Sequence, residues 1–241
     1  MTRQYNRFAF FLLLFLGIIV GCQKTDAPET PSAPAESTAA QPPTVTDSTA
    51  TEGAAEGTIV AVGDSLTEGF GLPEGEAYPA VLEARLREAG YDFQVVNAGI
   101  SGETSSGAKS RAEWVLKLEP DIVILGTGAN DGLRGVDPAV TRKNIAETVE
   151  IFQNRGVVVI LTGLQMVRNM GEEFTREFAA VYPDVAREKE AILVPFFLEG
   201  VAMESSLNQD DGIHPNAEGY RRIVDGLFPY VVQAIEKWRA G

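Results

Sequence analysis

Five short apolar runs alternate with longer amphipathic segments from residue 58 to the end of the chain, and this alternation restricts the fold more than any other feature. The runs lie at residues 58–62, 93–97, 122–125, 157–161 and 192–194 and are rich in β-branched residues. Nearly continuous apolar runs of this length are typical of strands that are buried on both faces of a parallel sheet.

The segments between and after these runs have helical patterns. They lie at residues 76–89, 105–118, 138–155, 172–189 and 216–238. Strand and helix units in series imply right-handed crossovers, and therefore helices on both faces of a parallel sheet. We predict a three-layer α/β fold with a doubly wound, five-stranded parallel sheet of the flavodoxin type. We expect one domain over residues 58–241.

The first 22 residues predict an export signal. Arg3 and Arg7 precede an uninterrupted apolar run at residues 8–20, which is shorter than the roughly 20 apolar residues of a membrane span. Cys22, the only cysteine, follows in Ile-Val-Gly-Cys, which resembles the lipobox of bacterial lipoproteins. The resemblance implies a lipid on Cys22 and, because Gln23 follows, an outer-membrane location facing the periplasm. A plain secretory signal followed by a free thiol is the alternative.

The segment at residues 23–57 consists largely of Pro, Ala, Ser, Thr and Glu, with Val45 as its only large aliphatic residue. Such a composition buries too little apolar surface to fold. We predict a disordered linker, which as a flexible coil would span roughly 30 Å.

The net charge of −14 excludes one class of partner. Nucleic-acid binding depends on Lys and Arg side chains that neutralise phosphates. We therefore expect no nucleic-acid partner. Separately, we expect the chain to be a monomer.

Polar or glycine-rich turns follow four of the predicted strands. They lie at residues 63–67, 97–102, 126–131 and 210–215. In a doubly wound sheet the functional site lies beyond the carboxyl ends of the strands. The four turns are therefore expected on one rim of the sheet.

These turns carry four sequence blocks in a fixed order. Residues 63–66 read Gly-Asp-Ser-Leu, Gly102 follows the second predicted strand, Asn130 stands in Gly-x-Asn-Asp, and Asp211 precedes His214 by three residues. In this set the chain resembles the SGNH, or GDSL, hydrolase family. The resemblance implies a serine esterase of the arylesterase, acyl thioesterase or lysophospholipase type.

The residue types fit ester hydrolysis on chemical grounds as well. A serine hydroxyl is a poor nucleophile until a base takes its proton, and His214 is the only histidine. Asp211, three residues earlier, can accept the Nδ1–H of that ring and fix its tautomer. We predict a catalytic triad of Ser65, His214 and Asp211, with Asp210 as the competitor for the third role.

An oxyanion hole is the second requirement of acyl transfer, because negative charge develops on the substrate carbonyl oxygen. We predict that the backbone N–H groups of Ser65 and Gly102 and the side-chain amide of Asn130 supply the donors. Glycine at position 102 is expected to allow close approach of the backbone to the substrate. No metal or organic cofactor is implied.

Two apolar segments, at residues 164–170 and 196–198, run along the predicted rim. We expect Met166, Met170 and Phe197 to line a groove for an apolar acyl group. The substrate is then a small-molecule or lipid ester: an aryl ester, thioester or lysophospholipid. A carbohydrate O-acetyl esterase is the alternative.

Two other function classes stay open. The sequence of residues 102–110 is close to that of a phosphate-binding loop, although Ala108 is inserted before Lys109. A nucleotide-binding protein is therefore the first of these classes. A surface lipoprotein without enzymatic activity is the other, and it leaves the four blocks unexplained.

Overall fold

The computed structural model describes residues 55–166 and 170–241. Its centre is a sheet of five parallel strands in the order β2-β1-β3-β4-β5, which confirms the predicted doubly wound sheet. The strands are β1 (Gly57–Gly63), β2 (Phe93–Gly99), β3 (Ile122–Gly126), β4 (Val158–Thr162) and β5 (Ile192–Val194).

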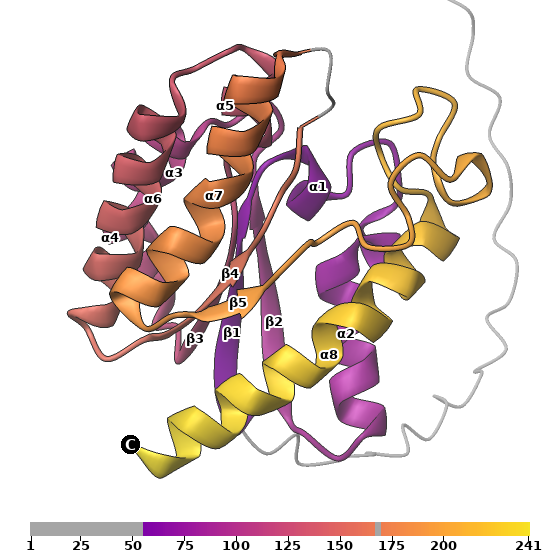
Figure 1. Cartoon of the computed structure of the whole chain (residues 1–241). Helices are drawn as coiled ribbons and strands as arrows, with labels where there is room; N and C mark the ends of the chain where they lie inside the picture. Colours follow the sequence, from indigo (N-terminus) through magenta and orange to yellow (C-terminus); the bar gives the residue numbers. More distant parts are fainter. Residues whose placement is uncertain (1–54, 167–169) are drawn as a thin grey trace, which may run out of the picture. The chain divides into compact units, whose positions relative to one another are not determined.

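Helices cover both faces of the sheet and complete three layers (Figure 1). One face carries α2 (Tyr78–Glu88) and α8 (Ala217–Ala240), and the other carries α3 (Ser105–Ser110), α4 (Ala112–Val115), α6 (Pro138–Gln153) and α7 (Glu172–Lys189). The remaining helical turns are α1 (Ser65–Glu68), α5 (Ala129–Leu133) and the 3₁₀ turns η1 (Glu74–Glu76), η2 (Leu116–Leu118) and η4 (Ser205–Leu207).

Two boundaries differ from the sequence prediction. The helix expected at residues 105–118 is divided into α3, α4 and η2, and Arg111 lies at the first break with non-helical angles (φ −103°, ψ 4°). The folded domain also begins earlier than residue 58. Gly57 pairs with Phe93 in the sheet, and the Glu56 carboxylate binds Arg239 near the end of α8.

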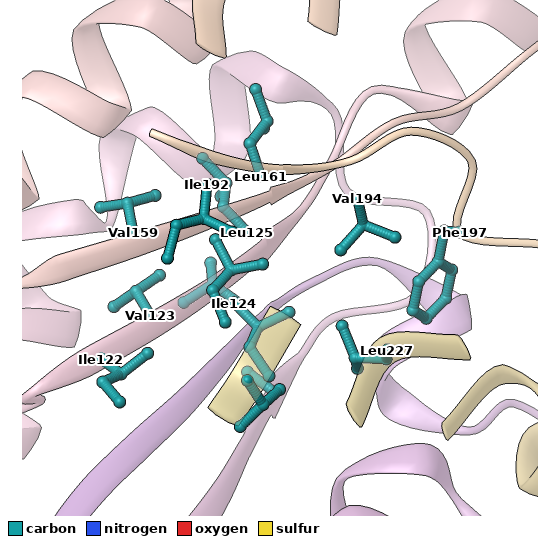
Figure 2. Close-up of a cluster of buried hydrophobic side chains, with 14 of the residues drawn as sticks. Ile122, Val123, Ile124, Leu125, Val159, Leu161, Ile192, Val194, Phe197 and Leu227 are labelled. Atoms are coloured by element: carbon teal, nitrogen blue, oxygen red, sulfur yellow. The ribbon is translucent and has the colours of Figure 1, made fainter. Parts of the chain in front are cut away.

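The core explains the continuous apolar strands. All four residues of the predicted run at 122–125 are fully buried, and side chains of β3, β4 and β5 form the cluster drawn in Figure 2. Helices on both faces remove most side chains of these strands from water, so alternation of polar and apolar residues is absent.

The register of the strands determines where the candidate site lies on the sheet. Gly63 at the end of β1 is aligned with Gly99 of β2 and with Gly126 of β3. The turns that follow these three strands therefore start side by side. The chain also reverses its winding direction between β1 and β3, and ligands of doubly wound sheets bind in the crevice at such a point.

The predicted export signal, Cys22 and most of the predicted linker lie outside the described residues. Within residues 55–166 and 170–241, every helix is too short or too polar to cross a membrane.

The close approach at Gly63 yields a prediction for stability. A Cβ atom at this position would overlap with the Thr67 hydroxyl and the Gly126 carbonyl oxygen. Gly63→Ala should lower the free energy of unfolding by about 1–3 kcal/mol, the cost of overpacking. Gly226→Ala is the control, because nothing lies within 4 Å of a Cβ on that exposed face of α8; it should stabilise by about 0.5–1 kcal/mol. Urea denaturation of both variants measures the difference, and equal stabilities would contradict the predicted clash.

Candidate active site

A tight turn at the end of β1 presents Ser65. Asp64 ends the turn as the N-cap of α1, where its Oδ1 accepts the Leu66 N–H at 3.1 Å. Ser65 is the first residue of this four-residue helix, and Gly69 ends the helix with φ 85°. The N–H of a first helical residue has no acceptor within the helix, so it is free to bind a ligand.

His214 and Asp211 approach Ser65 from the loop before α8. The Nε2 atom of His214 lies 2.9 Å from Ser65 Oγ, and its Nδ1 atom lies 2.7 Å from Asp211 Oδ2. The other carboxylate oxygen of Asp211 accepts the backbone N–H groups of Ile213 and His214, each at 3.0 Å. The structure thus brings together the three residues predicted for catalysis, and Asp211, not Asp210, contacts the ring.

The hydrogen bonds around Asp211 favour the ionised form of its carboxyl group. The bond from His214, followed by those from the two backbone N–H groups, lowers the pKa of Asp211 to about 2. An ionised Asp211 accepts the Nδ1–H of His214, which leaves the Nε2 lone pair directed at Ser65 Oγ. The ring is therefore oriented to take the serine proton.

Two residues that support His214 were missed by the sequence prediction. Gln209 Nε2 donates to the carbonyl oxygens of Phe70 at 2.7 Å and Pro215 at 3.0 Å, and so joins the histidine loop to the turn after α1. The Phe70 ring lies against the imidazole, with 4.8 Å between ring centroids. Gln209 and Phe70 are 139 residues apart, and no local pattern could have paired them.

Gly102 has a left-handed backbone, with φ 78°. A Cβ atom at this position would meet only Arg134 Nη2, at 3.7 Å. The positive φ is a second reason for glycine at this position, and the close approach of the backbone to the substrate stays a prediction. Arg134 Nη2 donates to the Gly102 carbonyl oxygen at 2.9 Å and holds this turn from outside.

Asn130 lies in α5, at the carboxyl end of β3. Its Nδ2 atom donates to the backbone carbonyl oxygen of Glu103 at 3.0 Å and lies 3.4 Å from Asp64 Oδ2. Asp64 itself is 1% exposed, and burial raises the pKa of its carboxyl to about 6. The amide of Asn130 is thus oriented by groups from the turns after β1 and β2.

The polar contacts of α3 argue against the nucleotide-binding alternative. The N–H of Ser105, at the start of α3, donates to the buried Asp131 carboxylate at 2.7 Å. Lys109 forms an ion pair with Glu147 at 3.0 Å. A carboxylate thus occupies the position where a phosphate-binding loop would present free donors, and its charge would repel a phosphate.

An apolar cavity of about 390 Å³ opens beside Ser65 and His214. Gly102 and Asn130 also line it. The rest of its wall is mostly apolar and includes Leu66, Phe70, Leu133, Leu164, Met166, Phe196, Leu198, Met203 and Ile213. Met166, which the sequence analysis expected in a substrate groove, thus lies on the wall of this cavity.

The other two residues expected in the groove lie elsewhere. Phe197 is 6% exposed and packs its ring against Tyr78, in the core beside Val194 and Leu227 (Figure 2). Its neighbours Phe196 and Leu198 line the cavity instead, because residue 197 points inward. Met170 lies near Gly135 and is not among the residues of the cavity wall.

Exposed apolar side chains border the mouth of the cavity. Phe70, Leu133, Met203 and Ile213 are between 49% and 91% exposed and come from four different segments. Large exposed apolar residues that gather in one place are typical of binding sites. In the described part of the chain, no cluster of three or more His, Cys, Asp or Glu residues could hold a metal ion.

Residues 61–222 match the model of the GDSL-like lipase/acylhydrolase family. Esterase TesA of Pseudomonas aeruginosa is 40% identical over 180 residues, which are 74% of this chain and 90% of that protein. Thioesterase 1/protease 1/lysophospholipase L1 of Escherichia coli K12 is 35% identical over 175 residues, 72% of this chain and 83% of that protein.

The fold is shared with a solved relative. The crystal structure of TesA is 39% identical, covers 73% of this chain and 99% of its own, and superposes with a TM-score of 0.71. The family match spans more than half of the chain and includes all four sequence blocks. The chain therefore belongs to the GDSL-like lipase/acylhydrolase family, and it is a carboxylic ester hydrolase.

Proposed function

We propose that this enzyme hydrolyses acyl esters through a triad of Ser65, His214 and Asp211. The observation that carries the proposal is the continuous hydrogen-bonded chain from Asp211 through His214 to Ser65 Oγ. It ends at a mostly apolar cavity, so an apolar acyl group would lie beside the nucleophile.

The reaction has two halves. Ser65 Oγ attacks the acyl carbon while its proton passes to His214 Nε2, and ionised Asp211 stabilises the imidazolium. The tetrahedral intermediate collapses when His214 returns the proton to the leaving oxygen or sulfur, which leaves an acyl group on Ser65. Water then attacks this acyl-enzyme with His214 again as base, and the acid is released.

The oxyanion formed in each half needs donors that are already in place. We assign this role to the N–H groups of Ser65 and Gly102 and to the Asn130 amide, because these three residues line the cavity. Each such donor is worth about 3 kcal/mol of barrier in other hydrolases.

The mostly apolar wall supports acyl esters, thioesters or lysophospholipids as substrates. Met166, Phe196, Leu198 and Met203 present flexible or flat apolar surfaces to the cavity. A carbohydrate O-acetyl esterase is the second candidate for the same triad, but a sugar site would be expected to present more polar side chains.

The substrate class is tested with p-nitrophenyl esters of increasing chain length and an acetylated sugar. Each buried methylene contributes up to about 0.8 kcal/mol. We therefore expect kcat/KM to rise about 10–100-fold from acetyl to hexanoyl. Ser65→Ala should abolish turnover and labelling by a fluorophosphonate while the protein stays folded. A kcat/KM that declines with every added carbon would favour the deacetylase, and labelling of Ser65→Ala would identify another nucleophile.

The role of Asp211 is tested against its neighbour. Asp211→Asn should lower kcat by about 10²–10⁴-fold, whereas Asp210→Asn, which alters an exposed side chain, should change it by less than about threefold. With its pKa lowered to about 2, Asp211 stays ionised down to strongly acidic pH. A larger loss in Asp210→Asn than in Asp211→Asn would refute the assignment.

We also propose that the enzyme is exported and held at the outer membrane by a lipid on Cys22. The support is the lipobox-like segment that ends at this cysteine. Cys22→Ser should move active enzyme from the detergent phase to the aqueous phase, since two acyl chains anchor a protein stably. Intact-mass measurement of the wild-type protein gives the independent readout, and an unmodified thiol there would disprove the anchor.

A further inference from the structure

Arg111 interrupts the helical segment after β2, and its side chain turns inward at the break. The side chain is only 14% exposed, and that of its partner Glu103 is 7% exposed. The two form a forked pair: Arg111 Nε binds Glu103 Oε1 and Nη2 binds Oε2, each at 2.7 Å. Among the Arg and Lys ion pairs of the described residues, this is the one in which both partners are less than 15% exposed.

The same guanidinium also binds the ends of two strands. Arg111 Nη2 donates to the carbonyl oxygen of Ala98 in β2 at 2.7 Å and lies 3.4 Å from that of Gly63 in β1. Gly63 stands two residues before Ser65. Arg111 therefore joins the turn that carries the nucleophile to the turn that carries Gly102.

Glu103 extends the connection to the third strand. Its backbone carbonyl oxygen accepts the hydrogen bond from Asn130 Nδ2 at 3.0 Å, and Glu103 directly follows Gly102. When Arg111 fixes the Glu103 side chain, it also fixes the backbone that orients the Asn130 amide.

We propose that Arg111 is a positioning residue that, through Glu103, preorganises the oxyanion hole and above all the Asn130 amide. This role rests on the proposed function. Donors for an oxyanion are effective because they are held in place before charge develops. A planar guanidinium can bind both carboxylate oxygens and a strand carbonyl at once, whereas a lysine ammonium has a different geometry.

Burial of the pair favours this role over a purely structural one. Taking two charges out of water is costly, and apolar residues often stabilise a buried position as well as an ion pair does. The exposed pair of Arg142 and Glu188 has a lower desolvation cost, because water still solvates both partners. The Arg111 contacts, in contrast, reach the carboxylate of Glu103, next to Gly102, and the strand ends that precede Ser65 and Gly102.

A double-mutant cycle in the full chain tests the proposal, with p-nitrophenyl hexanoate as substrate. Asn130→Ala should lower kcat by about 10²–10³-fold. Arg111→Met should lower kcat at least about tenfold with KM changed less than about threefold, since the transition state loses more than the bound substrate. If Arg111 acts through Asn130, adding Arg111→Met to Asn130→Ala should lower kcat less than about threefold further.

Three further measurements separate positioning from general destabilisation. The inhibition constant of a trifluoromethyl ketone, which forms a tetrahedral adduct with the serine, should rise in Arg111→Met by the factor by which kcat/KM falls. Arg142→Met removes a guanidinium from an exposed pair and should leave kcat unchanged. Arg111→Lys keeps the positive charge but loses the guanidinium that binds both carboxylate oxygens of Glu103. If Arg111→Met does not fold, Arg111→Lys replaces it in the double-mutant cycle.

The outcomes are distinct. Losses that multiply in the double variant, or a raised KM with unchanged kcat, would overturn the role of Arg111 while leaving the proposed function intact. Absence of turnover in the wild-type protein would contradict the proposed function itself, and the role of Arg111 with it.

Discussion

The alignment of three strand ends is the constraint on which the site depends. Gly63, Gly99 and Gly126 share one level of the sheet, so the turns after β1, β2 and β3 begin next to one another. Burial of the strands on both faces fixes this register, because sliding one strand would move its apolar side chains out of the spaces they fill. The side chains that follow can then meet within hydrogen-bond distance.

Polar groups buried beneath the turns convert this alignment into a fixed arrangement. Asp64 caps α1 and approaches Asn130, Asp131 joins α5 to the start of α3, and Arg111 binds Glu103 and two strand ends. Burial of these groups costs free energy, as the raised pKa of Asp64 indicates. Their hydrogen bonds offset part of that cost and leave each turn a single conformation.

The cavity has a polar end beside Ser65 and a mostly apolar wall. Ser65, Gly102 and Asn130 lie near the strand ends, while α5 and the segments after β4 and β5 contribute most of an apolar wall and part of an exposed apolar rim. A substrate with an apolar acyl part would be drawn into this wall and would present its carbonyl to the polar end. Displacement of water from that end strengthens the hydrogen bonds on which the reaction relies.

The order of elements and the candidate catalytic residues could be predicted from the amino-acid sequence alone. Apolar runs of strand length fixed the parallel sheet, and a single histidine with a carboxylate three residues earlier left few choices beside Ser65. The tertiary structure was needed to place the side chains whose positions depend on contacts between distant segments. It placed Phe196 rather than Phe197 on the cavity wall, brought Gln209 to Phe70, and turned Arg111 inward. Local spacing encodes which residues share an element, but the direction of a loop side chain is set by the packing of elements that meet only after folding.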